Sequence, residues 1–417
     1  MREHLNRERA FLVLLYFSVY TRYNLAKNFT SGLAGFIAKS LFWQQSCLIP
    51  AIKEVYLALQ RQLNQAKANK EDEFYTQYAD IQNEVNAYVD FNPDVFRDKT
   101  ILLPCDDPEW SNFTKFFAQN FDRFGLKKLI STSFAPESKK YMDYQPSLFE
   151  QESPIFDEDM SKTHGKIFTL EKDSSDNRRD LADLKWNYLD GTGDFRSREV
   201  CKLRDEADFI ITNPPFSLFR DFLQWILEAD KKFLIIGNQN AITYKEVFPL
   251  LKDNVIWLGK KSGDMAFTVP SYYEPRSTRF WVDETGQKWR SMGNICWFTN
   301  IDLAKRHEYL SLMTMADNLK YSKHKEIKEQ GYLKYDNYDA IEVPYTDAIP
   351  SDYEGVMGVP ITFMDKYSPE QFNIVGLTAG NIRGLAGLES KTGKDGPYIG
   401  GKLKYGRIFI QQRRRYK

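Results

Sequence analysis

The chain has 417 residues, of which 42% are hydrophobic and 27% charged, so it is long enough for a large α/β domain and a second module. Lysine plus arginine and aspartate plus glutamate each number 57, which gives a formal net charge of zero. This balance argues against a globally basic nucleic-acid binder, so any DNA-binding face must be a local patch.

The cysteines and histidines give no sign of a metal site or a disulfide framework. The four cysteines lie far apart without a CxxC pair, and the four histidines show no metal-ligand spacing. We therefore expect no bound metal, and a reducing, cytoplasmic location.

Residues 1–68 are predicted to form a helical N-terminal extension. Arg2, Arg7 and Arg9 precede the apolar run 10–20, a pattern that superficially copies a signal peptide. The run is much shorter than the roughly 20 residues that span a bilayer, and residues 21–24 (Thr-Arg-Tyr-Asn) replace a small-residue cleavage site. We expect no membrane association.

Residues 69–300 alternate short apolar runs with amphipathic stretches, a pattern typical of a Rossmann-like, mostly parallel sheet with helices on both faces. A long polar loop with prolines is expected after residue 135, and antiparallel strands after residue 254. The predicted helices cover 77–90, 111–124 and 217–227, and the predicted strands 100–104, 128–134, 167–170, 207–212, 232–237, 255–258, 278–282 and 295–299.

Residues 301–417 are polar, rich in tyrosine and punctuated by proline, so we predict a smaller, less regular region. Its tyrosines with interleaved lysines have two interpretations, base and phosphate contacts or a half-buried core. The basic tail at 404–417 either contacts phosphates or is a solvated end.

The most informative motif is Asn213-Pro214-Pro215-Phe216. The apolar strand before it must end at Asn213, because neither proline has an N–H to donate to a sheet. Open α/β sheets bind their ligands at the carboxyl ends of strands, so this motif is placed where a ligand binds. The alternative is a turn that merely ends the strand.

These residue types suit the methylation of an amine on an aromatic ring. Such an amine is a poor nucleophile, and it must attack a sulfonium methyl group in line. The Asn213 side-chain oxygen and the Pro214 carbonyl can each accept one of its N–H bonds and hold it in position, while Pro215 keeps that carbonyl rigid. Phe216 offers a face on which a flipped base stacks, and this chemistry requires no metal.

In this motif the chain resembles the class I amino-methyltransferases, and more narrowly the EcoRI-type adenine-specific DNA methyltransferases. Three further segments are similar to that family in the same order: 72–77 with Asp80 and Ile81, 101–113, and 193–195. The resemblance covers residues 70–300 and, less specifically, 359–369.

The resemblance implies S-adenosylmethionine as the cofactor and N6 of adenine in double-stranded DNA as the target. It implies a restriction-modification enzyme with a cognate restriction endonuclease as functional partner, or one that acts alone, with target recognition in residues 301–417. The residues implied in catalysis are Asn213, Pro214, Pro215 and Phe216, and those implied in cofactor binding are Phe74, Tyr75, Thr76, Cys105, Asp106, Asp107, Pro108, Asp194 and Phe195.

Two departures from the family pattern bear on the cofactor. The first strand is not followed by a glycine-rich loop, so the loop from Cys105 to Pro108 must supply the turn. The second strand ends in Ser133 and Phe134 without an acidic residue, which leaves the cofactor ribose contact unassigned. Asp106 and Asp107 have a competing interpretation as caps of the next helix.

Two alternative functions remain open. The same pocket serves the methylation of amines in RNA and of glutamine amides in proteins. A catalytically silent nucleic-acid-binding protein on the same scaffold is the second alternative, against which the intact motif argues.

Overall fold

The computed structural model describes residues 74–109, 111–135, 155–172, 186–271, 273–378 and 384–413. The predicted helical extension, residues 1–68, lies outside the described residues. The chain divides into two compact units, Met1–Glu71 and Asp72–Lys417, and the second contains every element described below.

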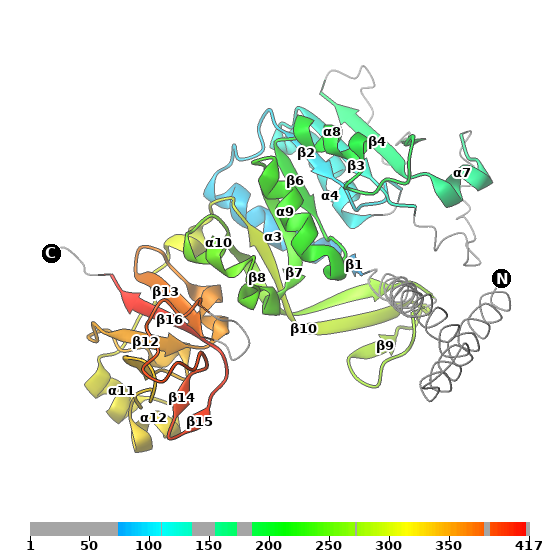
Figure 1. Cartoon of the computed structure of the whole chain (residues 1–417). Helices are drawn as coiled ribbons and strands as arrows, with labels where there is room; N and C mark the ends of the chain where they lie inside the picture. The colour runs from blue at the N-terminus through cyan, green and yellow to red at the C-terminus, as the bar shows by residue number, and fades with distance from the viewer. Residues whose placement is uncertain are drawn as a thin grey trace, which may run out of the picture. The chain divides into compact units, whose positions relative to one another are not determined.

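The second unit is built on one large sheet whose strand order is β1-β8-β10-β7-β6-β2-β3-β4-β5, with β9 paired to β10. Its four central strands, β7, β6, β2 and β3, are parallel, while β4, β5, β8, β9 and β10 pair antiparallel (Figure 1). The strands are β1 (Tyr75–Thr76), β2 (Thr100–Leu103), β3 (Lys128–Thr132), β4 (Lys166–Glu171), β5 (Trp186–Tyr188), β6 (Phe209–Thr212), β7 (Lys232–Asn238), β8 (Trp257–Val269), β9 (Phe280–Val282) and β10 (Lys288–Thr299). The parallel centre and the antiparallel strands after residue 254 confirm the sequence prediction.

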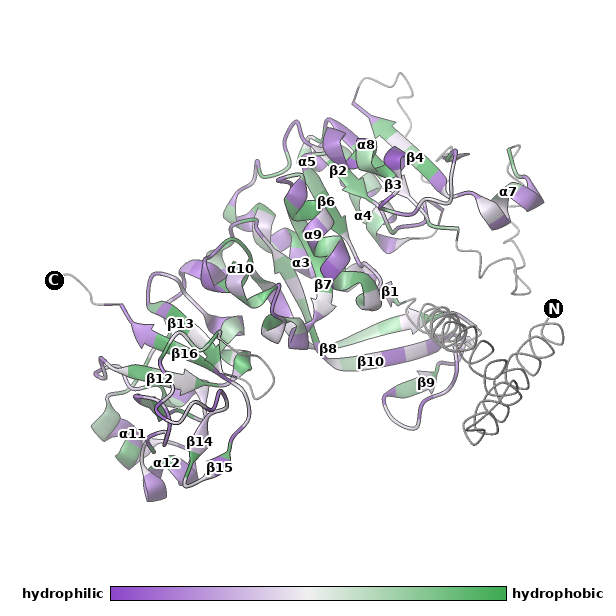
Figure 2. Cartoon of the chain, viewed as in Figure 1, coloured by the Kyte–Doolittle hydropathy of each residue, from purple (hydrophilic) through white to green (hydrophobic). Residues whose placement is uncertain are grey.

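Helices cover both faces of this sheet, because successive strand residues point to opposite sides. Leu102 and Ile210 pack in one buried cluster with α8, α9 and α10, whereas Ile101 and Ile211 pack in another with α3, α4 and α5. Figure 2 shows hydrophobic residues concentrated along the central strands. The helices are α3 (Tyr78–Phe91), α4 (Asn112–Gln119), α5 (Phe121–Phe124), α7 (Glu158–Thr163), α8 (Arg198–Glu206), α9 (Phe219–Glu228) and α10 (Phe248–Lys252).

Two helical details differ from the sequence prediction. The helix expected over 111–124 is two helices, because the Asn120 side chain donates to the Phe116 carbonyl and the chain turns there. Its five phenylalanines are buried, as predicted. Helix α7 lies within the segment expected to be loop, and it begins where the Asp157 carboxylate accepts two main-chain N–H bonds.

The C-terminal region is more regular than the sequence predicts, because its short strands find partners far along the chain. A second sheet has the order β11-β12-β16-β13, and β14 pairs with β15. Residues of this sheet share a buried cluster with α9 and α10, so the two sheets are joined by a continuous core. The elements are α11 (Met315–Tyr321), α12 (Lys325–Gln330), β11 (Ala340–Glu342), β12 (Val356–Val359), β13 (Phe372–Thr378), β14 (Tyr398–Ile399), β15 (Lys402–Leu403) and β16 (Arg407–Gln412).

The tyrosines of this region divide between the two interpretations that the sequence left open. Tyr335 and Tyr338 are buried and form part of a core cluster. Tyr309 and Tyr321 are exposed, with 46% and 62% of their surfaces accessible. Tyr405, in the basic C-terminal part, is 87% exposed, so several tyrosines of this region can offer rings to a partner.

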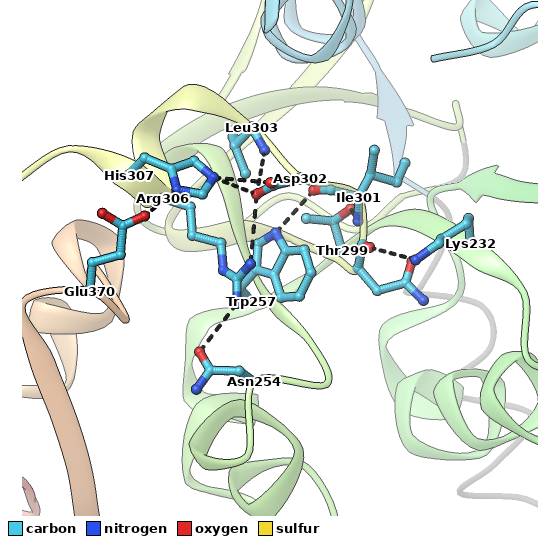
Figure 3. Close-up of polar contacts among 11 residues, drawn as sticks. Lys232, Asn254, Trp257, Thr299, Ile301, Asp302, Leu303, Arg306, His307 and Glu370 are labelled. Atoms are coloured by element: carbon cyan, nitrogen blue, oxygen red, sulfur yellow. Dashed lines mark hydrogen bonds and ion pairs between the residues drawn. The ribbon is translucent and has the colours of Figure 1, made fainter. Parts of the chain in front are cut away.

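Polar contacts fasten the C-terminal region to the end of the large sheet (Figure 3). The Arg306 guanidinium lies 3.8 Å from the ring centroid of Trp257, the first residue of β8. His307 approaches Asp302 at 3.0 Å and Glu370 at 2.7 Å, so it links the segment after β10 to the segment before β13. These contacts agree with one compact unit rather than loosely tethered domains.

Candidate active site

Asn213 follows the last residue of β6 and has its side-chain amide fixed in one orientation. Its Nδ2 donates a hydrogen bond to the main-chain carbonyl of Phe74 at 2.7 Å. Among the described residues, its Oδ1 is buried and has no hydrogen-bond partner. A buried acceptor without a donor is costly, so this oxygen is suited to receive an N–H group from a ligand.

The position of Asn213 is a point where the direction of chain crossover changes. From β2 the chain continues to β3 on one side, and from β6 it continues to β7 on the other. Open α/β sheets bind ligands in the crevice outside the carboxyl ends of strands at such a point. Cys105 and Asp106 lie beyond the end of β2, so the structure brings the predicted cofactor loop next to the predicted catalytic motif.

Asp106 connects three strand ends. Its Oδ1 accepts from the Ser111 hydroxyl and its Oδ2 from the Thr212 hydroxyl, both at 2.7 Å. Its main-chain N–H donates to the Thr132 carbonyl at the end of β3. Burial raises the pKa of Asp106 to about 7, although the two hydroxyl hydrogen bonds lower it. Because Thr212 precedes Asn213, this network helps to fix the predicted catalytic motif.

The loop after β2 forms its turn without glycine. The Asp107 carboxylate accepts from the Glu109 N–H at 2.9 Å, and the Asp107 carbonyl accepts from the Ser111 N–H. Ser111 is the residue that caps α4, so the two aspartates support the cap rather than forming it. Pro108 is buried in the same loop, and burial raises the pKa of the Cys105 thiol, with the Asp106 and Asp194 carboxylates adding to that effect.

The predicted N-terminal motif lies beside the predicted catalytic motif. Tyr75 and Thr76 form β1, which pairs with the C-terminal end of β8. The ring of Phe74 stacks on the ring of Phe216, with centroids 5.4 Å apart and an interplanar angle of 23°. Thr76 Oγ1 is buried and, like Asn213 Oδ1, has no partner among the described residues.

Asp194 and Phe195 follow β5 in a tight loop. Gly193 has φ +78°, and a Cβ there would overlap the Ser133 carbonyl oxygen, so glycine lets this loop pack against the end of β3. Burial raises the pKa of Asp194, but hydrogen bonds from Arg196 outweigh it, and the net shift is downward. The carboxylate is therefore ionised. The Phe195 ring packs in the core near Phe222 and Trp225.

Comparison with known proteins assigns the chain to a family. The model of the family described as adenine-specific methyltransferase EcoRI matches residues 62–413. The chain belongs to the EcoRI adenine-specific methyltransferase family. The type II methyltransferase M.EcoRI of Escherichia coli is 42% identical over 362 residues, which cover 86% of this chain and 99% of that protein.

The chain is also similar to a type II methyltransferase from another genus. The type II methyltransferase M.MpnI of Mycoplasma pneumoniae is 33% identical over 359 residues, covering 84% of this chain and 98% of the relative. No solved structure matches the chain. The motif that carried the resemblance contains one of the buried side-chain atoms that have no hydrogen-bond partner among the described residues, Asn213 Oδ1.

The sequence missed the polar residues that support the site. Thr212 and Ser111 hold Asp106, but a hydroxyl gives no sequence signal of its distant partner. Glu109 accepts from Lys166 Nζ at 2.6 Å and from Trp186 Nε1 at 2.9 Å. The main chain of Lys166 bonds to Ser133, so Glu109 brings a carboxylate toward the end of β3, where the sequence has no acidic residue.

The described ranges contain neither a metal-binding cluster of side chains nor a helix that could span a membrane. No group of three or more histidine, cysteine, aspartate or glutamate side chains in those ranges is arranged to hold a metal ion. None of the helices described is long and apolar enough to cross a membrane.

Proposed function

We propose that this adenine-specific DNA methyltransferase transfers the methyl group of S-adenosylmethionine to N6 of an adenine rotated out of double-stranded DNA. The pocket is formed by Asn213, Pro214, Pro215 and Phe216. The observation that carries the proposal is the buried Asn213 Oδ1, which has no hydrogen-bond partner in the described part of the chain, while the amide nitrogen of Asn213 is held by the Phe74 carbonyl. A base must leave the duplex to reach such a pocket.

The catalytic residues act by holding the amine. When bound, S-adenosylmethionine supplies a methyl group activated by its sulfonium. Asn213 Oδ1 and the Pro214 carbonyl each accept one N6–H bond, so the nitrogen faces the methyl group in line. The proton that methylation releases from N6 would pass to solvent, and Phe216 would support the base by stacking.

We assign cofactor binding to Phe74, Tyr75 and Thr76, to the loop Cys105, Asp106, Asp107 and Pro108, and to Asp194 and Phe195. Two observations fit these residues to the cofactor. Thr76 Oγ1 is a buried hydroxyl oxygen without a partner among the described residues, and Asp194 is an ionised carboxylate. The carboxylate can accept from the cofactor's adenine amine, because each of its oxygens has more than one acceptor site.

Residues 301–417 are assigned to DNA target recognition, with the domain boundaries at residues 68 and 300. Tyr321 is exposed there and Lys320 Nζ lies 4.8 Å from its ring, a combination that suits contact with bases and phosphates. We place the enzyme in the cytoplasm, where it either protects DNA from a cognate restriction endonuclease or acts alone.

Substitution of Asn213 tests the pocket. Asn213→Ala removes the acceptor, so we expect transfer to fall by at least a hundredfold while S-adenosylmethionine binds with wild-type affinity. Transfer is measured with labelled cofactor and unmethylated duplex DNA, and affinity by titration calorimetry. A variant that retains most of its activity would overturn the pocket assignment.

A further inference from the structure

We propose that the Phe74 ring occupies the place of the target base on Phe216 in the DNA-free enzyme, and that adenine enters by displacing it. This inference rests on the proposed function of Asn213 and Phe216. It makes Phe74 a positioning residue with two parts: a main-chain carbonyl that orients Asn213 and a ring that competes with the base.

The arrangement of the two rings is that of a stacked base on an aromatic side chain. The Phe74 and Phe216 centroids lie 5.4 Å apart and the planes differ by only 23°. Phe267 and Tyr273 meet Phe74 edge-on, at 5.7 Å and 6.0 Å, so the ring is enclosed on further sides. A ring so placed leaves that face of Phe216 covered.

The burial of the Asn213 side-chain oxygen leads to the same conclusion. Asn213 Oδ1 is the acceptor assigned to the adenine amine, yet this oxygen is not accessible to solvent in the DNA-free protein. A group near it must move before an amine can reach it. The Phe74 ring is stacked on Phe216, three residues from Asn213, whereas Phe267 meets Phe216 edge-on at 6.4 Å, so departure of the Phe74 ring would uncover the face on which another flat ring can stack.

The ring can move while the carbonyl stays. Strand β1 begins one residue after Phe74 and pairs with β8 through Tyr75 and Thr76. Asn112, the first residue of α4, donates from Nδ2 to the Thr76 carbonyl at 2.8 Å. The main chain is therefore held at several points, whereas the Phe74 side chain turns about its own bonds without disturbing the bond to Asn213.

If adenine must displace the Phe74 ring, removal of that ring should make extrusion of the base more favourable. An aromatic pair contributes about 0.5–1.5 kcal/mol beyond its buried area, which corresponds to roughly two- to tenfold in an equilibrium constant. Phe74→Leu keeps an apolar side chain and the carbonyl but has no ring to stack. We expect Phe74→Leu to raise the equilibrium constant for base extrusion roughly two- to tenfold. Phe91→Leu is the matched control, because Phe91 stacks instead on His307.

The first measurement uses a duplex with 2-aminopurine at the adenine that methylation mapping identifies, with S-adenosylhomocysteine present. Phe74→Leu should raise the fluorescence of the extruded base and tighten DNA binding two- to tenfold, whereas Phe91→Leu should change neither. If Phe74→Leu instead weakens only cofactor binding, with base extrusion unchanged, the proposed displacement is wrong.

The second measurement needs no DNA. With 4-fluorophenylalanine at position 216, the fluorine resonance of the DNA-free enzyme should shift when Phe74 becomes leucine, because a stacked ring has been removed. An unchanged resonance in the folded variant would overturn the proposal. If the resonance shifts but the wild type extrudes no base from any duplex, the stack is real and the proposed function has failed.

Discussion

The replacement of Asp106 by asparagine tests the network that connects the cofactor loop to the catalytic motif. Asp106 is 6% exposed, and its pKa of about 7 lies about 3 pH units above the usual value for aspartate. Each pH unit corresponds to about 1.4 kcal/mol, so ionised Asp106 lowers the free energy of unfolding by up to about 4 kcal/mol. An asparagine bears no charge and can still bond to both hydroxyls.

The sign of the effect follows from the direction of the pKa shift. Below about pH 4 Asp106 is protonated in both the folded and the unfolded chain, and it imposes no cost. As the pH rises toward 7, the unfolded carboxyl ionises first and wild-type stability falls. The stability gained by Asp106→Asn should therefore grow by about 1.4 kcal/mol per pH unit between pH 5 and 7, and then become constant.

Urea unfolding of both proteins from pH 5 to 8 measures this difference directly, because other titrating groups are common to both. Thr212→Val removes a hydrogen bond that lowers the pKa of Asp106, so this pKa should be higher in that variant. The stability gained by Asp106→Asn in the Thr212→Val background should therefore become constant only at a higher pH. A stability difference between wild type and Asp106→Asn that does not change with pH would refute this reasoning.

Three further substitutions probe other parts of the molecule. Asp194→Ala should weaken S-adenosylmethionine binding about tenfold or more, because a charged acceptor is lost, and an unchanged titration would contradict the assigned role. Arg407→Met should lower the free energy of unfolding by about 3–5 kcal/mol, since it leaves buried Glu342 unpaired; a loss below about 1 kcal/mol in urea would count against it. Glu84→Ala should lower the melting temperature, because it frees two main-chain N–H groups of β8 from a buried carboxylate, and an unchanged melting curve would exclude this.

The elements that the sequence predicted are those whose cause is local. Short apolar runs gave the central strands, and the spacing of five phenylalanines gave the buried face of α4 and α5. Pro214 and Pro215 fixed the end of β6, because a proline cannot donate to the neighbouring strand. The position of the Asn-Pro-Pro-Phe motif directly after the end of β6 was therefore predictable from the sequence.

The features that the sequence did not reveal depend on residues that meet only after folding. Thr212 bonds to Asp106 across 106 positions, and Arg407 pairs with Glu342 across 65. The second sheet was missed for the same reason, since β16 completes it from the end of the chain. The break at Asn120 arises from one side-chain hydrogen bond, which helical periodicity does not show.

The most direct test of the central claim is transfer of labelled methyl from S-adenosylmethionine to unmethylated duplex DNA, with RNA and protein substrates in parallel and nucleoside analysis of the product. We predict N6-methyladenine in DNA from the wild type and at least a hundredfold less from Asn213→Ala. Label found only in RNA or protein would contradict the DNA assignment, and no transfer to any substrate would contradict catalysis at this pocket.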